Sequence, residues 1–407
     1  MARRKDEDVS ARTARPIEPA WLGAIDRVAR ERLGRRDLRG PELARAVAYV
    51  SRTYTRDRDA LGLLAEDDAA LGARLRFFLP RDLAKIELPL EELARAGALP
   101  PARRWRVLDV GAGLGATALG VARFARAHEA ADAIAVHAVD RDSAALEVLS
   151  ALGACTRGDD LAGAAVPVEV RTTMADIARV GVDELGGPYD LVLVGLALNE
   201  LWHDADPADA TARRAARLVE LASALADDGT LVVIEPALRA TSRALQAVRD
   251  VIAASSQPPF VFAPCLRRGP CPMLANERDW CHDEIAVALP RELAEVASAA
   301  GLRREDLTFS HLTLRRDGRK LTDAFGGAPG TPLRIVSERL ESKGKVELFA
   351  CGEPGLVRLQ RLHRHASTQN AGLDEAVRGT LVALDGAPLE GGGARARVGP
   401  DVRASEI

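Results

Sequence analysis

Four of the five cysteines are placed where they could bind a metal centre. Three lie within seventeen residues on a proline-rich segment and one follows seventy residues later: Cys265, Cys271, Cys281 and Cys351. Thiols on an irregular loop make good ligands, and a four-sulfur site suits either tetrahedral zinc or an iron-sulfur cluster. The paired CxxC knuckles common in structural zinc sites are absent, and gaps of five and nine residues favour a cubane cluster, with zinc as the alternative. Cys155 is interpreted as a lone structural thiol.

A glycine-rich turn forms a second candidate site. The segment VLDVGAGLG places three glycines after an apolar run and before a helical pattern: Gly111, Gly113 and Gly115. Glycine permits a tight turn and lets a ligand approach the backbone closely. The spacing also satisfies the dinucleotide fingerprint, so the turn alone fits NAD or S-adenosylmethionine (SAM). A turn without any ligand is the remaining interpretation.

Two acidic residues favour SAM. Asp109 precedes the first glycine by two residues, where a carboxylate would oppose a pyrophosphate but could accept a hydrogen bond from the ammonium of a methionine moiety. Asp140 ends the next expected strand, where a carboxylate can hold both ribose hydroxyls of an adenosine. We therefore predict that Asp109 faces the methionine part of SAM and that Asp140 holds its ribose.

Two later polar residues extend this site. Asp176 follows the third expected strand and is predicted to meet the adenine amino group, with a helix cap as the alternative. Asn199 follows the fourth expected strand, at the edge where open α/β sheets bind ligands, and is predicted to line the methionine pocket. Glu200 is explained equally well as an acid at a helix N-terminus, and no catalytic base or nucleophile is identified.

The elements that position these residues follow from the apolar spacing. Apolar residues recur at helical intervals before residue 100, and short β-rich runs then alternate with alanine-rich helices, which predicts a parallel sheet covered on both faces. The fold class is therefore α/β, with a mostly parallel sheet and a β-rich C-terminal extension. The expected parts are a disordered tail over 1–16, a helical domain over 17–100, an α/β domain over 101–317 with a Cys-rich insertion at about 256–285, a β-rich domain over 318–386 and a flexible tail over 387–407.

Composition excludes several classes of protein. The 407 residues carry 56 basic and 59 acidic side chains, a net charge of −3, so no global basic excess indicates nucleic acid. No apolar run approaches the ~20 residues of a membrane helix, and the first residues lack the apolar core of a secretory signal. Five cysteines do not form a disulfide framework, so we expect a cytoplasmic protein without a membrane partner. No oligomeric state is predicted.

One segment is locally basic. Residues 311–370 hold eleven lysines and arginines against six carboxylates. We predict that this segment contacts RNA phosphates, with an ordinary solvated sheet face as the alternative. The residues assigned to RNA are Arg315, Arg316, Lys343, Lys345, Arg358, Arg361 and Arg364, with Arg319 and Lys320 beside them.

The motifs together resemble a known family. VLDVGAGLG, LNEL, VVIEP, APCLRRGPCPMLANERDWCHDE and GKVELFACGEPGLVR are similar to the methyltransferase-like proteins of the mitochondrial small ribosomal subunit and their bacterial relatives. The resemblance covers residues 40 to 360. It implies a seven-stranded class I (Rossmann-like) SAM methyltransferase fold, an OB-like extension, a [4Fe-4S] cluster on the four cysteines, and a role with the small ribosomal subunit or its rRNA.

Three functions from different classes follow. The first is a SAM-dependent methyltransferase acting on the small ribosomal subunit or its rRNA. The second is a non-catalytic assembly factor that keeps the methyltransferase fold and uses the cluster as a structural or redox-sensing element. The third is an NAD-linked oxidoreductase with an iron-sulfur centre.

Overall fold

The computed structural model describes residues 12–65, 67–303, 305–327, 329–387, 389–390 and 395–407. The predicted disordered tail, 1–16, falls largely outside these residues. Its last part does not: Thr13 forms a parallel bridge with Ala286, and Arg15 pairs with Glu87 at 2.7 Å. Residues 12–16 are therefore attached to the body of the protein.

Helices make up the N-terminal part. Their bounds are α1 Pro19–Leu33, α2 Gly40–Thr55, α3 Asp68–Ala73, α4 Leu79–Asp82 and α5 Glu87–Arg95, with a π-helical turn at Arg74–Phe78. In α2 the apolar residues Leu43, Val47 and Val50 recur at three- and four-residue intervals and are buried. Asp67 caps α3 by accepting from the backbone amides of Ala69 and Ala70.

The central part is an α/β domain built on one large sheet, which we call sheet A. Its strands are β1 Arg104–Val110, β2 Ala133–Asp140, β3 Val168–Met174, β4 Tyr189–Gly195, β5 Leu225–Pro236, β6 Phe260–Ala263, β7 Asp283–Ala286 and β8 Asp306–Arg315. The helices between them are α6 Ala116–Ala127, α7 Ser143–Cys155, α8 Val182–Leu185, α9 Pro207–Ala222, α10 Arg239–Ala253 and α11 Arg291–Ala299.

The strand order of sheet A identifies its fold. The order is β3-β2-β1-β4-β5-β8-β6, with β7 paired to β8 as an eighth strand. Strands β1 to β5 are parallel, and β8 runs antiparallel to β5, β6 and β7. This is the Rossmann-like methyltransferase fold, so the predicted fold class is confirmed, with one short strand more than the seven expected.

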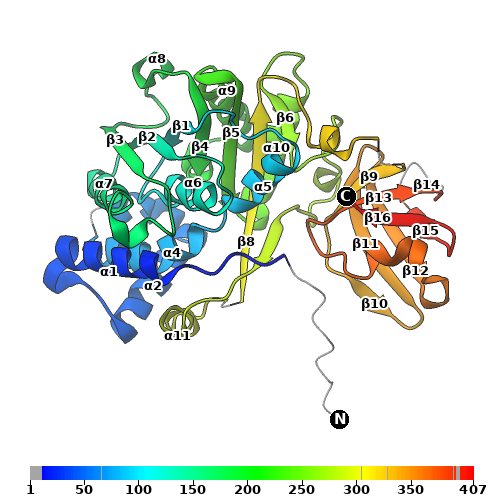
Figure 1. Ribbon diagram of the computed structural model, residues 1–407, viewed down its shortest axis with the longest axis horizontal. Helices are drawn as coiled ribbons and strands as arrows, with labels where there is room; N and C mark the ends of the chain where they lie inside the picture. Colours follow the sequence, from blue (N-terminus) through cyan, green and yellow to red (C-terminus); the bar gives the residue numbers. More distant parts are fainter. Residues whose placement is uncertain (1–11, 66, 304, 328, 388, 391–394) are drawn as a thin grey trace, which may run out of the picture.

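A second sheet, sheet B, forms the C-terminal part. Its strands are β9 Thr331–Ile335, β10 Leu340–Ser342, β11 Lys345–Gly352, β12 Gly355–Leu362, β13 Leu381–Asp385, β14 Leu389–Glu390, β15 Arg395–Val398 and β16 Arg403–Glu406. Sheet B and helices α1 and α2 lie on opposite sides of sheet A (Figure 1), whereas Glu92 of α5 contacts Arg334 of β9.

The flexible tail predicted over 387–407 is wrong where the structure describes it. Strand β15 pairs with β12 and β16 pairs with β13, so both belong to sheet B. Ala396, Val398 and Ala404 are buried in its core. Strands of four residues next to a glycine run give too weak a pattern to be recognised in the sequence.

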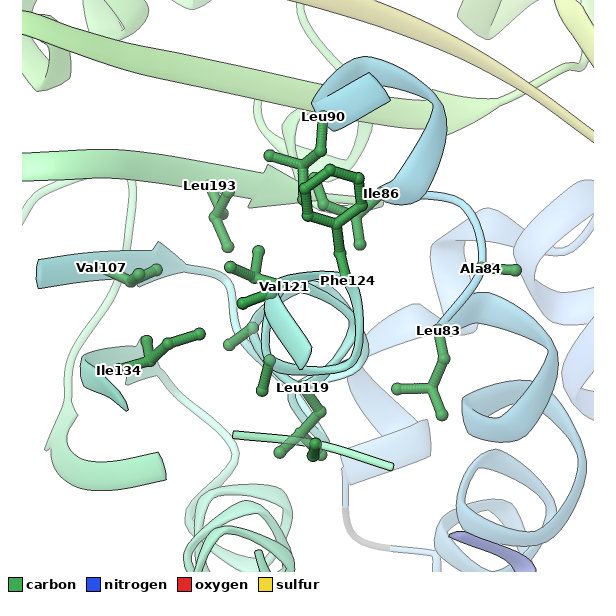
Figure 2. Close-up of a cluster of buried hydrophobic side chains, with 14 of the residues drawn as sticks. Leu83, Ala84, Ile86, Leu90, Val107, Leu119, Val121, Phe124, Ile134 and Leu193 are labelled. Carbon is green, nitrogen blue, oxygen red and sulfur yellow. The ribbon is translucent and has the colours of Figure 1, made fainter. Parts of the chain in front are cut away.

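Helix α6 lies at the centre of the main hydrophobic core. Figure 2 shows its Val121 and Phe124 between Val107 and Leu193 of sheet A and Ile86 of the N-terminal part. All five side chains are buried. Gly120 lies on the face of α6 toward the N-terminal helices, where an added Cβ would come within 2.5 Å of the Leu83 carbonyl oxygen. The N-terminal helices therefore pack directly on the glycine-turn helix.

A buried ion cluster joins the three parts of the chain. Glu92 of α5 accepts from Arg334 of β9 at 2.5 Å and from His311 of β8 at 3.3 Å, and His311 also pairs with Asp283 of β7 at 2.9 Å. Burial opposes charge on His311, but the two carboxylates raise its pKa to about 9.

Among the described residues, no helix has both the length and the apolar content of a membrane span.

Candidate functional site

The glycine turn requires glycine at each of its three positions. Gly111, Gly113 and Gly115 have φ values of 75°, 49° and 80°, in the left-handed region. A Cβ on Gly111 would lie 2.5 Å from the Cβ of Ala197, and one on Gly115 would lie 2.1 Å from Leu149. Gly113, which borders the cavity described below together with Gly111, is less crowded, because a Cβ there would meet only side-chain atoms, at 3.3 Å or more. The turn is therefore packed on both sides and open to a ligand at its middle glycine.

Asp109 lies beneath this turn and does not face the cavity, so that prediction is wrong. Its Oδ2 accepts from the Thr117 hydroxyl at 2.8 Å and from the Ala118 amide at 3.3 Å, which ties β1 to the start of α6. Burial raises the pKa of Asp109 to about 7. Its Oδ1 is buried without a hydrogen-bond partner among the described residues.

Asp140 is placed as the sequence predicts, at the end of β2 and on the cavity wall. Its Oδ2 accepts from the Gly113 amide at 2.7 Å, and its Oδ1 accepts from the Asp142 amide at 2.9 Å. Each carboxylate oxygen has a second lone pair, so both can still accept from the hydroxyls of a ribose.

The cavity lies between the carboxyl edge of sheet A and the N-terminal helices, with a volume of about 300 Å³. Sheet A contributes the glycine turn, Asp140 and Asn199, and the N-terminal part contributes Tyr54 and Arg74. Arg74 pairs with Asp142 at 2.7 Å, and its Nη2 lies 3.3 Å from where a Cβ on Gly113 would be. The guanidinium of Arg74 therefore covers part of the cavity floor at Gly113. The sequence did not indicate this role of Arg74.

Asp176 and Asn199 have different outcomes. Asn199 lines the cavity, where its side-chain amide donates to the Leu196 carbonyl at 3.3 Å. Asp176 does not line it: its side chain is 52% exposed, accepts from the Ala178 amide and pairs with Arg179. Asp176 therefore caps the turn at 177–179, and the next helix, α8, begins only at Val182.

Glu235 is a second residue that sequence reasoning missed. It is the second-last residue of β5, next to Pro236, which lines the cavity. Its Oε1 accepts a hydrogen bond from the backbone amide of Asn199 at 3.2 Å. Burial raises its pKa to about 8, and its Oε2 has no hydrogen-bond partner among the described residues. The signal available in the sequence was an acid directly after the apolar run 231–234 at the end of a strand.

All four cysteines of the proposed metal site border one cavity, which also includes Arg249 and Arg334. Burial, together with neighbouring charges that include the other three cysteines, raises the pKa of Cys281 well above its usual value. In the described part of the chain, no three His, Cys, Asp or Glu side chains converge closely enough to hold a metal ion. The thiols thus line a shared space without meeting at one point. A donor set of four soft sulfurs fits an iron-sulfur cluster.

Arginines of α10 hold the long cysteine loop in place. Arg243 donates through Nη1 to the carbonyls of Met273, Asn276 and Asp279, at 3.0, 2.8 and 2.7 Å. Arg249 donates to the Gly269 carbonyl at 2.7 Å. Charge-assisted hydrogen bonds therefore satisfy the backbone of a segment with little regular structure.

The residues predicted to contact RNA do not form one exposed surface. Arg315 and Arg361 are buried: Arg315 bonds to Asp317, Thr230 and the Ala98 carbonyl, and Arg361 bonds to Asn370 and Asp374. Both are therefore wrong as phosphate contacts. Lys345 and Arg358 pair with Glu347, and Arg316, whose side chain is 34% exposed, bonds to the Leu225 carbonyl. Lys343 and Arg364 are exposed.

Comparison with known families decides the relationship of the chain. The family model of the mitochondrial small ribosomal subunit protein Rsm22 matches residues 79–376. The chain belongs to the Rsm22 family. The Rsm22 match includes the glycine turn, the cysteine loop and most of sheet B. The predicted methyltransferase-like family is thus confirmed, and no curated protein sequence matches the chain.

Solved structures related to this Rsm22-family chain are distant. A protein from Pyrococcus horikoshii with a provisional RNA methyltransferase assignment is 12% identical, covering 58% of this chain and 85% of its own, with a TM-score of 0.33. An rRNA methylase from Streptococcus thermophilus is 14% identical, covering 56% and 96%, with a TM-score of 0.29. A SAM-dependent methyltransferase from Clostridium acetobutylicum is 12% identical, covering 44% and 56%, with a TM-score of 0.25.

Proposed function

We propose that this protein is a SAM-dependent methyltransferase that acts on the small ribosomal subunit or its rRNA. The observation that carries the proposal is Asp140, whose two oxygens are oriented by the Gly113 and Asp142 amides at the open face of the glycine turn. SAM would supply the methyl group, while this chain orients its ribose and excludes water with the N-terminal helices. The ribosomal substrate is supported by the Rsm22 family description.

Calorimetric titration with SAM, S-adenosylhomocysteine and NAD tests the cofactor. We expect SAM and S-adenosylhomocysteine to bind and NAD not to bind. Binding of NAD alone would replace the methyltransferase by the oxidoreductase alternative. Transfer of labelled methyl groups from SAM to purified small-subunit particles then tests the reaction itself.

A second candidate is an assembly factor that does not transfer methyl groups. The observation that favours it is Arg74, which lies over Gly113 and pairs with Asp142, so the chain itself occupies part of the proposed cofactor floor. In that case the protein binds small-subunit particles without labelling them, and Arg74→Ala does not restore transfer.

We further propose that Cys265, Cys271, Cys281 and Cys351 hold one [4Fe-4S] cluster, with a structural role. The supporting observations are the shared cavity and the two buried arginines beside it, which offset the negative charge of thiolates. Iron and acid-labile sulfide analysis of anaerobically prepared protein tests this. Stoichiometric zinc without iron would identify a zinc site instead. A reduced cytoplasmic environment, which we also propose, suits free thiol ligands.

A further inference from the structure

A second cavity, of about 390 Å³, lies at the outer edge of sheet A beside β6. The end of α10, β6, the start of the cysteine loop and the turn after β8 line it. Arg315 at the end of β8 pairs with Thr230 near the start of the parallel part of β5, so this turn lies at the amino edge of the parallel strands. The Asp140 cavity lies at the opposite, carboxyl edge. We call the second cavity the β6 pocket.

The β6 pocket is lined by cations without acidic residues. Arg267, Arg268 and Lys320 border it, and no described lining residue is Asp or Glu. None of the three side chains forms an ion pair among the described residues, and the Nε of Arg267 is buried without a hydrogen-bond partner. The neighbouring carboxylates of Asp323 and Glu353 accept from the backbone amides of Lys320 and Arg268. The pocket therefore has positive charge available for an anion.

An aromatic ring completes the pocket. Phe260, the first residue of β6, is partly exposed and lines it. Gly318 has a φ of 73°, and a Cβ there would lie 3.7 Å from the ring, so glycine leaves this edge of Phe260 uncovered. Ser255, Ser256 and Thr322 add hydroxyl groups to the wall. An uncovered ring beside cations is the combination that binds nucleotides of single strands.

We propose that the β6 pocket binds one nucleotide unit, with its base against Phe260 and its phosphate on Arg268 and Lys320. The cavity is at the opposite edge of sheet A from Asp140, so this nucleotide is an anchor and not the group that is methylated. Only its assignment to an rRNA strand rests on the proposed function. A free nucleotide presents the same chemistry.

Two probes separate these sources, each used with the full-length protein. Fluorescence anisotropy measures binding of a labelled single-stranded oligouridylate, and calorimetry measures binding of uridine monophosphate. The variants are the double substitution Arg268→Ala with Lys320→Ala, and Phe260→Leu, which keeps an apolar side chain but removes the ring. Arg157→Ala, an exposed cation at the end of α7, is the matched control.

The two variants should have different signatures. The double substitution should weaken oligouridylate binding about tenfold and make the slope of log affinity against log salt shallower by about 0.7, the value for one phosphate of a single strand. Phe260→Leu should weaken binding at least about fivefold with the parental slope, because stacking carries no counterions. Arg157→Ala should match the parent, and thermal unfolding should show that all variants are folded.

Binding of oligouridylate without uridine monophosphate identifies an RNA strand as the source, and binding of both includes free nucleotides. Parent binding that neither variant alters would overturn the pocket while leaving the proposed contact with rRNA intact. A parent that binds SAM but neither probe would also overturn it, without touching the cofactor proposal.

Discussion

Two carboxylates on adjacent strands, Asp109 and Asp140, have different roles because their surroundings differ. Asp109 is enclosed beneath the glycine turn, where burial raises its pKa to about 7. Its carboxyl group accepts a hydrogen bond from the Thr117 hydroxyl, which holds β1 against α6. Asp140 borders the cavity and is held by two backbone amides. The residue types in the sequence therefore located the site, but only the burial seen in the structure shows that Asp109 has a structural role while Asp140 faces the cavity.

Asp140→Asn should weaken SAM binding about tenfold or more. An amide presents an N–H₂ group where a ribose hydroxyl needs an acceptor, and a hydrogen bond to a charged group contributes about 1.5–3 kcal/mol. Calorimetry measures the change. Asp401→Asn, an exposed acid of the C-terminal part, is the control and should bind as the parent does. Parental affinity in Asp140→Asn would remove Asp140 from the cofactor site.

Glu235→Gln should flatten the pH dependence of stability. Burial raises the folded-state pKa of Glu235 from 4.5 to about 8, so the folded protein binds this proton more tightly than the unfolded chain does. The resulting stabilisation is complete below pH 4.5 and is lost as the pH rises through about 8. The parental free energy of unfolding should therefore fall over this window by at most about 1.4 kcal/mol per pH unit.

Urea unfolding of both proteins across that pH range measures the difference. Exposed Glu292→Gln is the control and should retain the parental slope. Equal slopes for the parent and Glu235→Gln would show that Glu235 is ionised in the folded protein at neutral pH.

At the scale of elements, the cysteine loop depends on α10 and β11. Arg243 and Arg249 of α10 bind loop carbonyls, while Cys351 of β11 supplies the one thiol that comes from sheet B. A cluster on these four thiols would add its binding free energy to the stability of the structure that its ligands join, the cysteine loop and β11 of sheet B. The loop and sheet B would therefore share that stabilisation.

Cys351→Ser should abolish iron loading and increase protease cleavage within residues 256–285. The substitution removes one of four ligands and leaves three thiols on a loop that is then held by hydrogen bonds alone, mainly from α10. Sheet A should remain folded because its core is separate. Iron analysis and limited proteolysis measure the two effects. Cys155→Ser, at the end of α7, is the matched control and should keep its iron. Full iron loading in Cys351→Ser would contradict the four-cysteine site.

At the scale of the molecule, three parts meet at Glu92. This side chain touches Arg334 of sheet B and His311 of sheet A while belonging to the N-terminal helices. Burial opposes its charge, but the two cations lower the pKa of Glu92 to about 2. Glu92 thus compensates the charge of Arg334 and shares the compensation of His311 with Asp283.

Glu92→Gln should destabilise the protein by about 3–5 kcal/mol, the cost of leaving a buried charge uncompensated. Denaturant unfolding measures the change, and separate transitions for sheet B and the remainder would show that their docking has weakened. Glu91→Gln, the exposed neighbour on α5, should have a small effect. A loss below about 1 kcal/mol would show that the cluster does not hold the parts together.

Removing the exposed cations of sheet B should change the salt dependence of RNA binding. Replacing Lys343 and Arg364 by Ala should make the slope of log affinity against log salt shallower by about 1.4 to 1.8, for two phosphate contacts. The double replacement of Arg358 and Arg361 is a poor test, because Arg361 is buried and its loss would disturb sheet B. A slope equal to that of the parent in the Lys343 and Arg364 variant would show that these two residues do not contact phosphates.

The sequence predicted those features that come from a repeating pattern of apolar residues or from a short local motif. Alternating strands and helices gave the α/β class, and the glycine spacing located the ligand turn. The burial of Arg315 depended on partners far away in sequence, Thr230 and the Ala98 carbonyl. Asp109 and Arg361 bond to nearer residues, Thr117 and Asn370, but no pattern in the sequence identifies these pairs. Arg74 was missed for the same reason as the burial of Arg315: its partner Asp142 lies 68 residues later.

The attachment of residues 12–16 has a consequence for synthesis of the chain. The Arg12 carbonyl accepts from the Ala286 amide at 2.7 Å, and its guanidinium reaches the Gly379 carbonyl, 367 residues away. During translation residues 12–14 leave the ribosome long before Ala286 and Gly379 exist, so they stay unpaired from these partners while the sheet beside them is still being made. Closing such a long loop is a late event of slow, non-local folding. A chain arrested before residue 286 would therefore expose this segment to proteases, and the completed chain would conceal it.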